Sequence, residues 1–383
     1  MKTRNIVLIV ALIVIAGVIF WLESQQTRIT GPSPESDIIA ENLTREQQNN
    51  VSGQEQTAQF DYPTQQDLQR IEQKSQKYDR AKELVDPGKF INTEPFNISS
   101  LIGKQIVLVD FWTYSCINCQ RTLPYLNAWH EKYSDKGLTI IGVHTPEFKF
   151  EENFNNVKNA VERFNIAYPV VQDNEYKTWR AYNNRYWPRK YLIDVDGFII
   201  YDHIGEGAYE ETELKIQELL KERKEVLGIG EEVPEGTADV DADGPSFGRI
   251  NSPEIYFGYK RGKEQIGNRQ GYQPDEIVNY AITQAPKANK FYLEGEWKNN
   301  PENMELVSEK GSLIFKYNAK NVNLVAGSGS PAELTVVLDG IEKETITVQE
   351  ETLYELIEGD DYGEHVLGIN FNQGIKIYTF TFG

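Results

Sequence analysis

The two cysteines of this chain stand two residues apart, at Cys116 and Cys119, soon after an apolar, β-branched run at residues 106–109. The run predicts a buried strand, and the helical spacing of apolar residues over 119–133 predicts that a helix follows. Structural disulfides usually join positions that are farther apart, so a single pair at this spacing is typical of a redox site. The strand, the turn with its cysteines and the helix together indicate a mixed α/β domain.

A helix that begins at Cys116 would place unpaired backbone N–H groups and the positive end of the helix dipole beside its sulfur. These groups favour the thiolate, which is the attacking species in disulfide exchange. We therefore expect Cys116 to be the nucleophile and Cys119, one turn further on and less exposed, to resolve the mixed disulfide. No cofactor other than this redox-active pair is expected.

Asp110 lies within the predicted apolar strand, six residues before Cys116. Burial of a carboxyl raises its pKa, so Asp110 could exchange a proton with the resolving cysteine. The alternative is an aspartate at a strand end that is satisfied by backbone donors.

The N-terminus carries an unbroken apolar run at residues 6–22, preceded by Lys2 and Arg4. Basic residues on the upstream side and the absence of a nearby small-x-small cleavage site predict one transmembrane helix, with the rest of the chain on the extracytoplasmic side of the bilayer. A cleaved signal peptide is the alternative, and it would leave the compartment unchanged. The formal net charge of −19 argues against nucleic acid as a partner.

Composition divides the chain into five parts. A polar, Gln- and Asn-rich stretch after the anchor predicts a flexible tether, helical toward its end, and a Gly- and Asp-rich stretch predicts a linker. Turn signals at Asp196-Gly197, Asp339-Gly340 and 372–374 predict hairpins. The expected parts are an anchor (1–23), a tether (24–85), an α/β domain (86–226), an acidic linker (227–247) and an all-β, jelly-roll-like sandwich (248–383).

The α/β domain resembles the thioredoxin superfamily in three places: Asp110 and Trp112 before the cysteines, Pro124 after them, and Trp187-Pro188 before a strand. The resemblance implies a thioredoxin fold in which Pro188 is a cis-proline whose strand edge docks the partner's backbone. Thioredoxins have Trp where this chain has Ser115, and Gly-Pro where it has 117–118. Because the residues between the cysteines tune the reduction potential, we expect a reductant but the direction of exchange stays open.

Longer motifs are similar to the extracytoplasmic thioredoxin-like part of DipZ proteins, and they lie at 111–125, 142–148, 186–188 and 252–258. DipZ proteins also contain a multi-span electron-transferring domain, whereas here a single apolar segment stands in that place. The resemblance therefore implies a separate membrane electron donor of the CcdA type, with protein disulfides or dithiols as substrates. A homodimer through the β-domain is left open.

Residues 147–171 form an insert that resembles those of TlpA-like and peroxiredoxin proteins. Glu147, at its start, is a candidate second carboxylate near the sulfurs, with a plain surface glutamate as the alternative. Trp112, Tyr114 and Trp187 are expected to form an apolar collar around the site, or else to pack in the core.

Thiol peroxidation, copper delivery and glycan binding are the alternatives to disulfide exchange. A thiol peroxidase would use Thr113 with Cys116, but Val109 stands where its motif has proline. A copper-delivering protein would add a histidine to the two thiols, yet His130 is eleven residues beyond Cys119, and we expect no metal site. The β-domain resembles carbohydrate-binding modules and could bind glycans through exposed aromatic residues, among them Trp297 and Tyr354.

Overall fold

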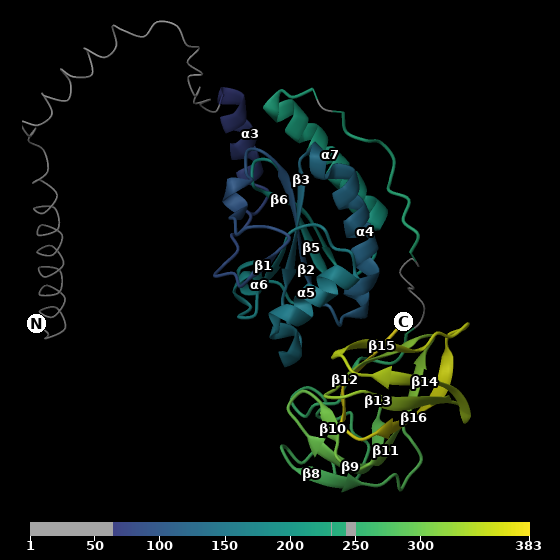
Figure 1. The fold of residues 1–383 in the computed structure, drawn as a ribbon. Coiled ribbons are helices and arrows are strands. Elements are labelled where there is room, and N and C mark those ends of the chain that lie inside the picture. Colours follow the sequence, from purple (N-terminus) through teal and green to yellow (C-terminus); the bar gives the residue numbers. More distant parts are fainter. Residues whose placement is uncertain (1–63, 231, 243–249) are drawn as a thin grey trace, which may run out of the picture. The chain divides into compact units, whose positions relative to one another are not determined.

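The computed structural model describes residues 64–230, 232–242 and 250–383 (Figure 1). The expected anchor and the tether up to residue 63 lie outside the described residues. Among the described residues, no helix is both long enough and apolar enough to cross a bilayer.

The strand predicted before the cysteines is β2, and it lies inside a six-stranded sheet with the order β1-β4-β3-β2-β5-β6. It pairs in parallel with β3 and antiparallel with β5. The strands of this sheet are β1 (Phe90–Ile91), β2 (Ile106–Trp112), β3 (Leu138–His144), β4 (Val170–Gln172), β5 (Arg189–Ile193) and β6 (Ile199–Ile204).

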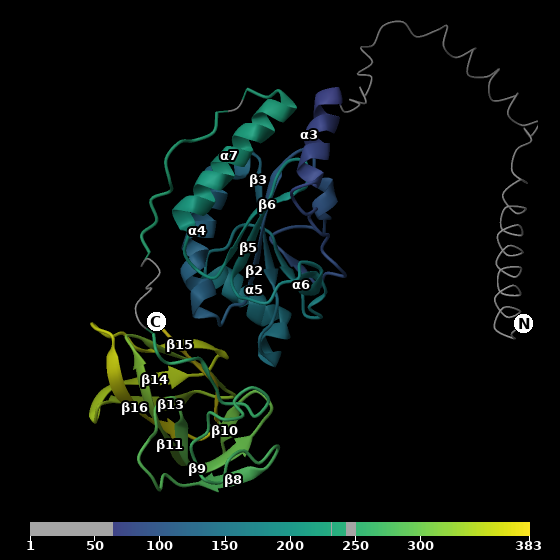
Figure 2. The ribbon, with the colours of Figure 1, turned by 180° about the vertical axis from the view of Figure 1, so that it is seen from behind.

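Helices cover both faces of this sheet. Figures 1 and 2 show α4 and α7 together on one face and α3 on the opposite side. The α-helices are α3 (Gln65–Ser75), α4 (Ile117–Tyr133), α5 (Phe154–Arg163), α6 (Lys177–Ala181) and α7 (Tyr209–Leu227), and single 3₁₀ turns occupy Ile98–Ser100, Ser134–Lys136 and Lys149–Glu152. The predicted strand–turn–helix unit and the Asp196-Gly197 hairpin are confirmed.

Alternation along β2 divides the domain into two apolar cores. Ile106, Leu108 and Trp112 face the core that contains α4, α5 and α7, whereas Val107, Val109 and Phe111 face a core that contains α6. Asp110 shares the face of Leu108, since side chains two apart on a strand point the same way. Its carboxyl is therefore directed toward α4, the helix that carries Cys119.

The folded part begins earlier than the expected boundary at residue 86. Leu84 is buried in the core beneath α6, and the backbone N–H of Ala81 donates to the carbonyl of Gly197. α3 buries no residue and is held by ion pairs of Arg70 and Lys74 to acidic residues of the domain. The polar composition that suggested a tether here reflects a helix that docks through charge rather than through apolar contact.

Part of the expected linker is also packed on the domain. The backbone N–H of Ala238 donates to the carboxylate of Glu213 on α7, and the ammonium of Lys132 donates to the carbonyl of Gly236. Residues 231 and 243–247 of that linker lie outside the described residues.

The second domain is all-β, as the sequence predicts, with its strands in one eleven-stranded sheet. The strands are β7 (Ile255–Tyr256), β8 (Ile277–Tyr280), β9 (Phe291–Asn299), β10 (Met304–Leu306), β11 (Lys310–Ala319), β12 (Val322–Ser328), β13 (Ala332–Leu338), β14 (Ile341–Val348), β15 (Thr352–Ile357), β16 (Gly363–Asn372) and β17 (Ile375–Phe382).

β9 joins the two halves of this sheet, because its first residues pair with β11 and its last residues pair with β8 and β10. Gly295 has φ 102° near this change of partner, a conformation that side-chain-bearing residues rarely adopt. The hairpin predicted at Asp339-Gly340 is confirmed between β13 and β14. The hairpin predicted at 372–374 is wrong: this turn connects β16 to β17, but β16 pairs with β11 and β13 whereas β17 pairs with β10 and β12.

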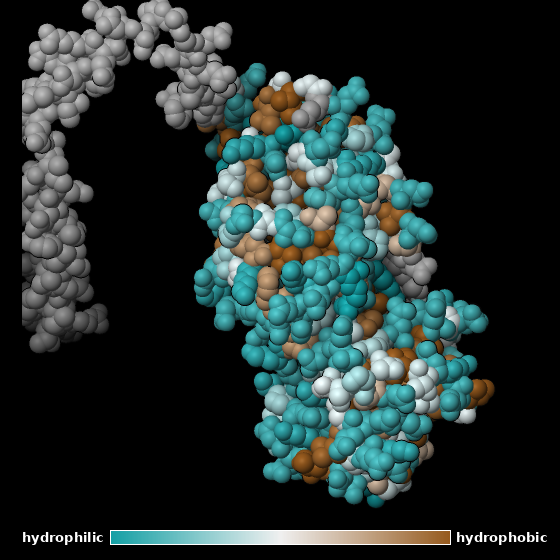
Figure 3. All heavy atoms as spheres, viewed as in Figure 1, coloured by the Kyte–Doolittle hydropathy of each residue, from teal (hydrophilic) through white to brown (hydrophobic). Residues whose placement is uncertain are grey.

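The two domains share apolar packing. Val325 and Tyr378 of the β-domain belong to the same buried cluster as Trp112, Leu123 and Phe150. Residues 63–383 accordingly form one compact unit. The face shown in Figure 3 is mostly hydrophilic, in keeping with the high net charge.

Candidate redox site

Cys116 is the N-cap residue of α4, at the end of the turn that follows β2. Its Sγ accepts a hydrogen bond from the backbone N–H of Cys119 at 3.3 Å. Both cysteines are free thiols, and Cys116 is partly exposed while Cys119 is only 1% exposed. The outer sulfur thus lies at the start of α4 with a backbone donor directed at it, which is the position that the sequence predicts.

The inner sulfur lies in a setting that opposes ionisation. Burial, followed by the hydrogen bond and the charge of Cys116, raises the pKa of the Cys119 thiol well above its usual value. Cys119 therefore stays protonated until a base removes its proton, and only then can it attack.

Asp110 is a buried carboxyl whose charge acts on the Cys119 thiol. Burial raises the pKa of its carboxyl to about 7, although the charge of Lys190 acts in the opposite direction. Its Oδ1 atom is buried and has no hydrogen-bond partner among the described residues. A carboxyl with a pKa near neutrality is suited to taking a proton from a buried thiol and releasing it again.

Lys190 is a buried cation beside Asp110 that was not predicted from the sequence. The two residues lie opposite each other on β5 and β2, and Lys190 is 1% exposed. Burial lowers the pKa of its ammonium, and its Nζ donates to the carbonyl of Gly205 at 3.3 Å. The available signal was strand periodicity, because Lys190 shares the inward face of β5 with Leu192.

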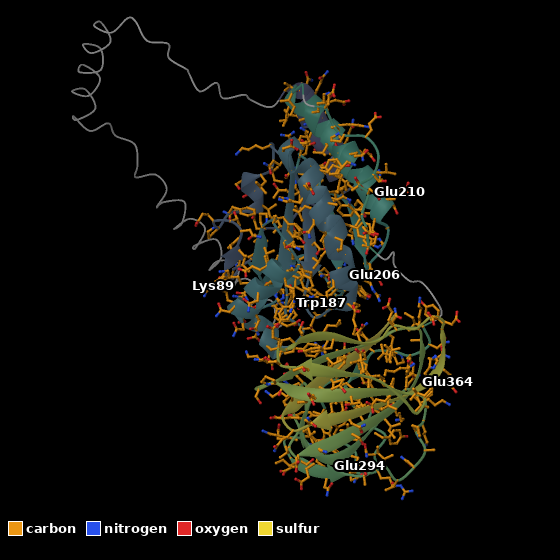
Figure 4. The ribbon with its side chains drawn as sticks, turned by 45° about the vertical axis from the view of Figure 1, so that its right-hand side comes forward. Lys89, Trp187, Glu206, Glu210, Glu294 and Glu364 are labelled. Atoms are coloured by element: carbon orange, nitrogen blue, oxygen red, sulfur yellow. The ribbon has the colours of Figure 1, made fainter. Side chains whose placement is uncertain are left out.

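The bond between Trp187 and Pro188 is cis, in agreement with the predicted cis-proline. Pro188 is buried and leads directly into β5. Trp187, labelled in Figure 4, lies at one end of the six-stranded sheet, and its Nε1 donates to the carbonyl of Thr145 at 3.0 Å. Its ring packs against that of Trp179, with centroids 4.3 Å apart.

Trp112 and Tyr114 pack around His144 rather than forming an exposed collar. The His144 ring lies edge-on to Trp112 and is stacked on Tyr114, and burial lowers its pKa to about 3, so it is neutral. Trp112 is fully buried, and Tyr114 donates through its hydroxyl to the carbonyl of Glu351 in the β-domain. Of the three predicted collar residues, only Trp187 is partly exposed.

The structure places Glu147 against the β-domain. Its carboxylate accepts from Arg261 at 2.5 Å, and the same oxygen lies 2.9 Å from the hydroxyl of Tyr256. The carboxylate that contacts the cysteine turn is instead Glu151, which is fully buried and accepts from the hydroxyl of Ser115 at 2.6 Å. Its signal in the sequence was the pair Phe148 and Phe150 shortly before it, aromatic residues that predict burial of this segment.

The aromatic residues suggested for glycan binding are mostly core residues. Trp297 and Phe380 are fully buried, Tyr317 and Tyr378 are almost so, and Tyr354 is partly buried and packed against the same core. They do not form an exposed stacking face, because their rings fill the space between the strands.

One group of carboxylates outside the redox site lies within metal-binding distance, formed by Asp194, Asp196 and Glu222. The ammonium of Lys74 contacts all three, at 2.6 Å from Asp194 and 2.8 Å from Asp196. A cation of the chain itself therefore already neutralises this group.

Comparison with protein families divides the chain as its fold does. Residues 80–202 match the AhpC/TSA family, and residues 252–383 match the family described as "Thioredoxin like C-terminal domain". The cysteines, Asp110 and Pro188 all fall within the first match. A thioredoxin-type fold with a dithiol at a helix start defines the class of thiol-disulfide oxidoreductases.

This chain belongs to the thioredoxin superfamily and is DipZ-like. It is 34% identical over 290 residues to Protein DipZ of Mycobacterium bovis, a match that covers 76% of this chain and 40% of that protein. It is 31% identical over 147 residues to the thiol-disulfide oxidoreductase ResA of Bacillus cereus, covering 36% of this chain and 81% of ResA.

Among solved structures, a thiol:disulfide interchange protein DsbE from Chlorobium tepidum is 26% identical, with a TM-score of 0.34. That match covers 37% of this chain and 96% of the other. The chain spans about 40% of the length of the DipZ proteins that it matches.

Proposed function

We propose that this protein is a membrane-anchored, extracytoplasmic oxidoreductase that reduces disulfides in protein substrates through Cys116 and Cys119. The observation that carries the proposal is the contrast between the two sulfurs. Cys116 is partly exposed at the start of α4, whereas Cys119 is buried behind it and close to Asp110.

The reaction proceeds in two exchanges. The Cys116 thiolate attacks a substrate disulfide, forms a mixed disulfide and releases one substrate thiolate, which takes a proton from solvent. Asp110 then accepts the proton of Cys119, and the Cys119 thiolate attacks Cys116 Sγ. The second substrate sulfur leaves as a thiolate and takes a proton from solvent, so the substrate is reduced to a dithiol while the chain is oxidised to the Cys116–Cys119 disulfide.

Return to the dithiol requires two electrons from a donor. A membrane thiol donor of the CcdA type is the partner we propose, with the partner's chain docked beside Pro188. A separate donor fits a chain in which the described residues hold only one cysteine pair.

The mechanism is tested by two serine variants. Cys116→Ser should abolish reduction of insulin disulfides, whereas Cys119→Ser should accumulate mixed disulfides that are visible on non-reducing gels. Retained activity in Cys116→Ser would refute the proposal. Ser134→Ala, at the C-terminal end of α4, serves as a control variant that leaves both sulfurs and the cysteine turn unchanged.

The direction of exchange is tested by equilibrating the pair with glutathione or dithiothreitol buffers. A reduction potential near about −270 mV would be that of a thioredoxin-like reductant, whereas about −120 mV would make the protein an oxidant. The second value would reverse the proposed direction while leaving the roles of the two sulfurs intact.

Anchoring is tested by fractionating cells that express the full chain or a chain without residues 1–23. The full chain should sediment with membranes and be digested by protease added outside, and the shortened chain should be soluble. Protection of the full chain from external protease would refute the extracytoplasmic location.

A further inference from the structure

A short segment after β3, residues 145–152, lies between the redox site and the β-domain. On one side it touches the strands and the turn that carry the redox residues: the N–H of Thr145 donates to the carbonyl of Trp112 at 3.0 Å, and the carbonyl of Thr145 accepts from Trp187. On the other side it contacts residues of the β-domain. A shift of this segment would therefore change contacts at both the redox site and the β-domain.

Glu151 is the contact between this segment and the cysteine turn. One carboxylate oxygen accepts from both the hydroxyl and the N–H of Ser115, at 2.6 and 3.3 Å. The other accepts from the N–H groups of Glu147 and Phe148, at 2.6 and 3.0 Å. Four donors on one fully buried carboxylate tie the residue before Cys116 to the start of the segment.

The β-domain holds the opposite side of the segment with polar groups. Arg261 donates to the Glu147 carboxylate at 2.5 Å and to the Glu147 carbonyl at 3.3 Å. The hydroxyl of Tyr256 lies 2.9 Å from the same carboxylate, and Glu302 accepts from the N–H of Lys149 at 2.9 Å. Since the Glu147 side chain is only 12% exposed, its charge depends on Arg261 for compensation.

Aromatic packing adds to this contact. The ring of Tyr378 in the β-domain lies 5.3 Å from that of Phe148 and 4.8 Å from that of Phe150. Phe148 and Phe150 both stand shortly before Glu151 in the chain, so the β-domain packs against the segment that leads into this carboxylate.

Arg261 also affects the electrostatics of the segment, because the segment carries two acidic side chains, Glu147 and Glu151, close to each other. Burial raises the pKa of Glu151, and the nearby charge of Glu147 raises it further. The Arg261 guanidinium compensates Glu147, so its removal would leave the charge of Glu147 uncompensated next to Glu151, which contacts the turn that holds Cys116.

We propose that the β-domain is a built-in part of the redox site: Arg261 and Tyr256 hold the 145–152 segment where Glu151 anchors the Cys116 turn. Glu151 and Arg261 are thus positioning residues for the thiol chemistry, and this role rests on the proposed function. The β-domain acts on the sulfurs through three links, Arg261 to Glu147, Glu147 to Glu151 through the backbone, and Glu151 to Ser115.

The test compares Arg261→Ala and Arg261→Lys with Arg163→Ala in the full chain. Arg163 is a matched control because it also joins the two domains, through Glu350 and Thr352, but does not touch the segment. Two quantities are measured: amide hydrogen exchange at Ser115, Glu147 and Phe148, and the equilibrium of the cysteine pair with glutathione.

In Arg261→Ala we expect exchange at these amides to become about tenfold faster, as for a lost charge-assisted hydrogen bond. The glutathione equilibrium should move toward the Cys116–Cys119 disulfide, because an uncompensated acidic group disfavours the thiolate. Arg261→Lys should restore part of both effects, and Arg163→Ala should cause neither. Equal behaviour of Arg261→Ala and Arg163→Ala would overturn the proposal.

Glu151→Gln gives a second route that leaves the domain interface untouched. An amide has one acceptor oxygen, so it cannot serve both Ser115 and the two backbone N–H groups, and exchange at one set should rise. Unchanged exchange at all three amides would also overturn the proposal. Hydrogen exchange needs no substrate, so this failure is distinguishable from a failure of disulfide reduction itself.

Discussion

Asp110 and Lys190 face each other across the junction of β2 and β5, as a buried acid and base close to the thiol of Cys119. Burial raises the pKa of the acid and lowers the pKa of the base, so each group is shifted toward its neutral form. The pKa of the Asp110 carboxyl therefore lies near neutrality, which suits a group that exchanges a proton with a buried thiol.

The resolution step should depend on pH through Asp110. The carboxylate accepts a proton only when ionised, so release of substrate from the mixed disulfide should accelerate as pH rises through about 7. In Asp110→Asn this step should be about 100-fold slower and lose that rise. Rapid-quench experiments measure the rate at which the mixed disulfide disappears, with Asp202→Asn as an exposed control. An unchanged rate in Asp110→Asn would exclude a role for Asp110 in this step.

Asp110 should also make the dithiol form less stable at higher pH. Its folded pKa of about 7 exceeds its ordinary value of 3.8, so the folded state binds more protons between these values and stability falls as pH rises through them. Between pH 4 and pH 8, the free energy of unfolding of Asp110→Asn should therefore rise relative to that of the unchanged protein by on the order of 4 kcal/mol. Urea denaturation at both pH values measures this difference, and a constant difference would contradict the shift.

Lys190 should set where the Asp110 transition falls. Its positive charge lowers the pKa of Asp110, so Lys190→Met should move the midpoint of the resolution rate above pH 7 while keeping the volume of the side chain. The same rapid-quench assay gives the midpoint. A midpoint that stays fixed or moves to lower pH would show that the ammonium does not act on this carboxyl.

Docking of α3 should be sensitive to salt. The helix buries no residue and depends on Lys74 and Arg70, whose charges meet Asp194 and Asp196. Lys74→Ala should expose Gln65–Ser75 to limited proteolysis, as should about 1 M NaCl in the unchanged protein. Lys77→Ala is the control, since Lys77 is next to the helix but outside this ion-pair group; equal cleavage in the two variants would reject the role of Lys74.

Trp297 should matter for stability and not for sugar binding. Its ring is fully buried against Phe371, so Trp297→Ala should lower the free energy of unfolding by about 3–5 kcal/mol. Thermal unfolding measures the loss. Tyr354→Ala, at a partly buried position, should cost less, and specific glycan binding by the intact protein that either variant abolishes would restore the glycan-binding hypothesis.

Sequence patterns were sufficient where one segment carries the whole feature. β2, the Cys116 turn and α4 are continuous in the chain, and the Asp339-Gly340 turn has positive φ at both residues, as its composition predicts. Asp110 was identifiable for the same reason, since a carboxylate in an apolar strand is visible without knowledge of its neighbours.

The other partners in the site come from distant parts of the chain, and spacing does not reveal them. Lys190 lies beside Asp110 on the neighbouring strand, and Glu151 reaches Ser115 from an insert 36 residues away. Glu147 is a candidate from sequence because it stands just past β3, yet its partner is Arg261, 114 residues further on. Proximity to the end of a strand correctly indicated the segment. Within that segment, however, Glu151 and not Glu147 is the carboxylate that contacts the cysteine turn.

The shared packing of Val325 and Tyr378 with the core behind Cys119 bears on how such chains diversify. A domain that is attached by a linker alone can be exchanged between proteins by recombination. Here an exchanged β-domain would also have to supply matching aromatic and basic residues for the thioredoxin-fold partner, so the two halves are constrained to vary together as a single evolutionary module.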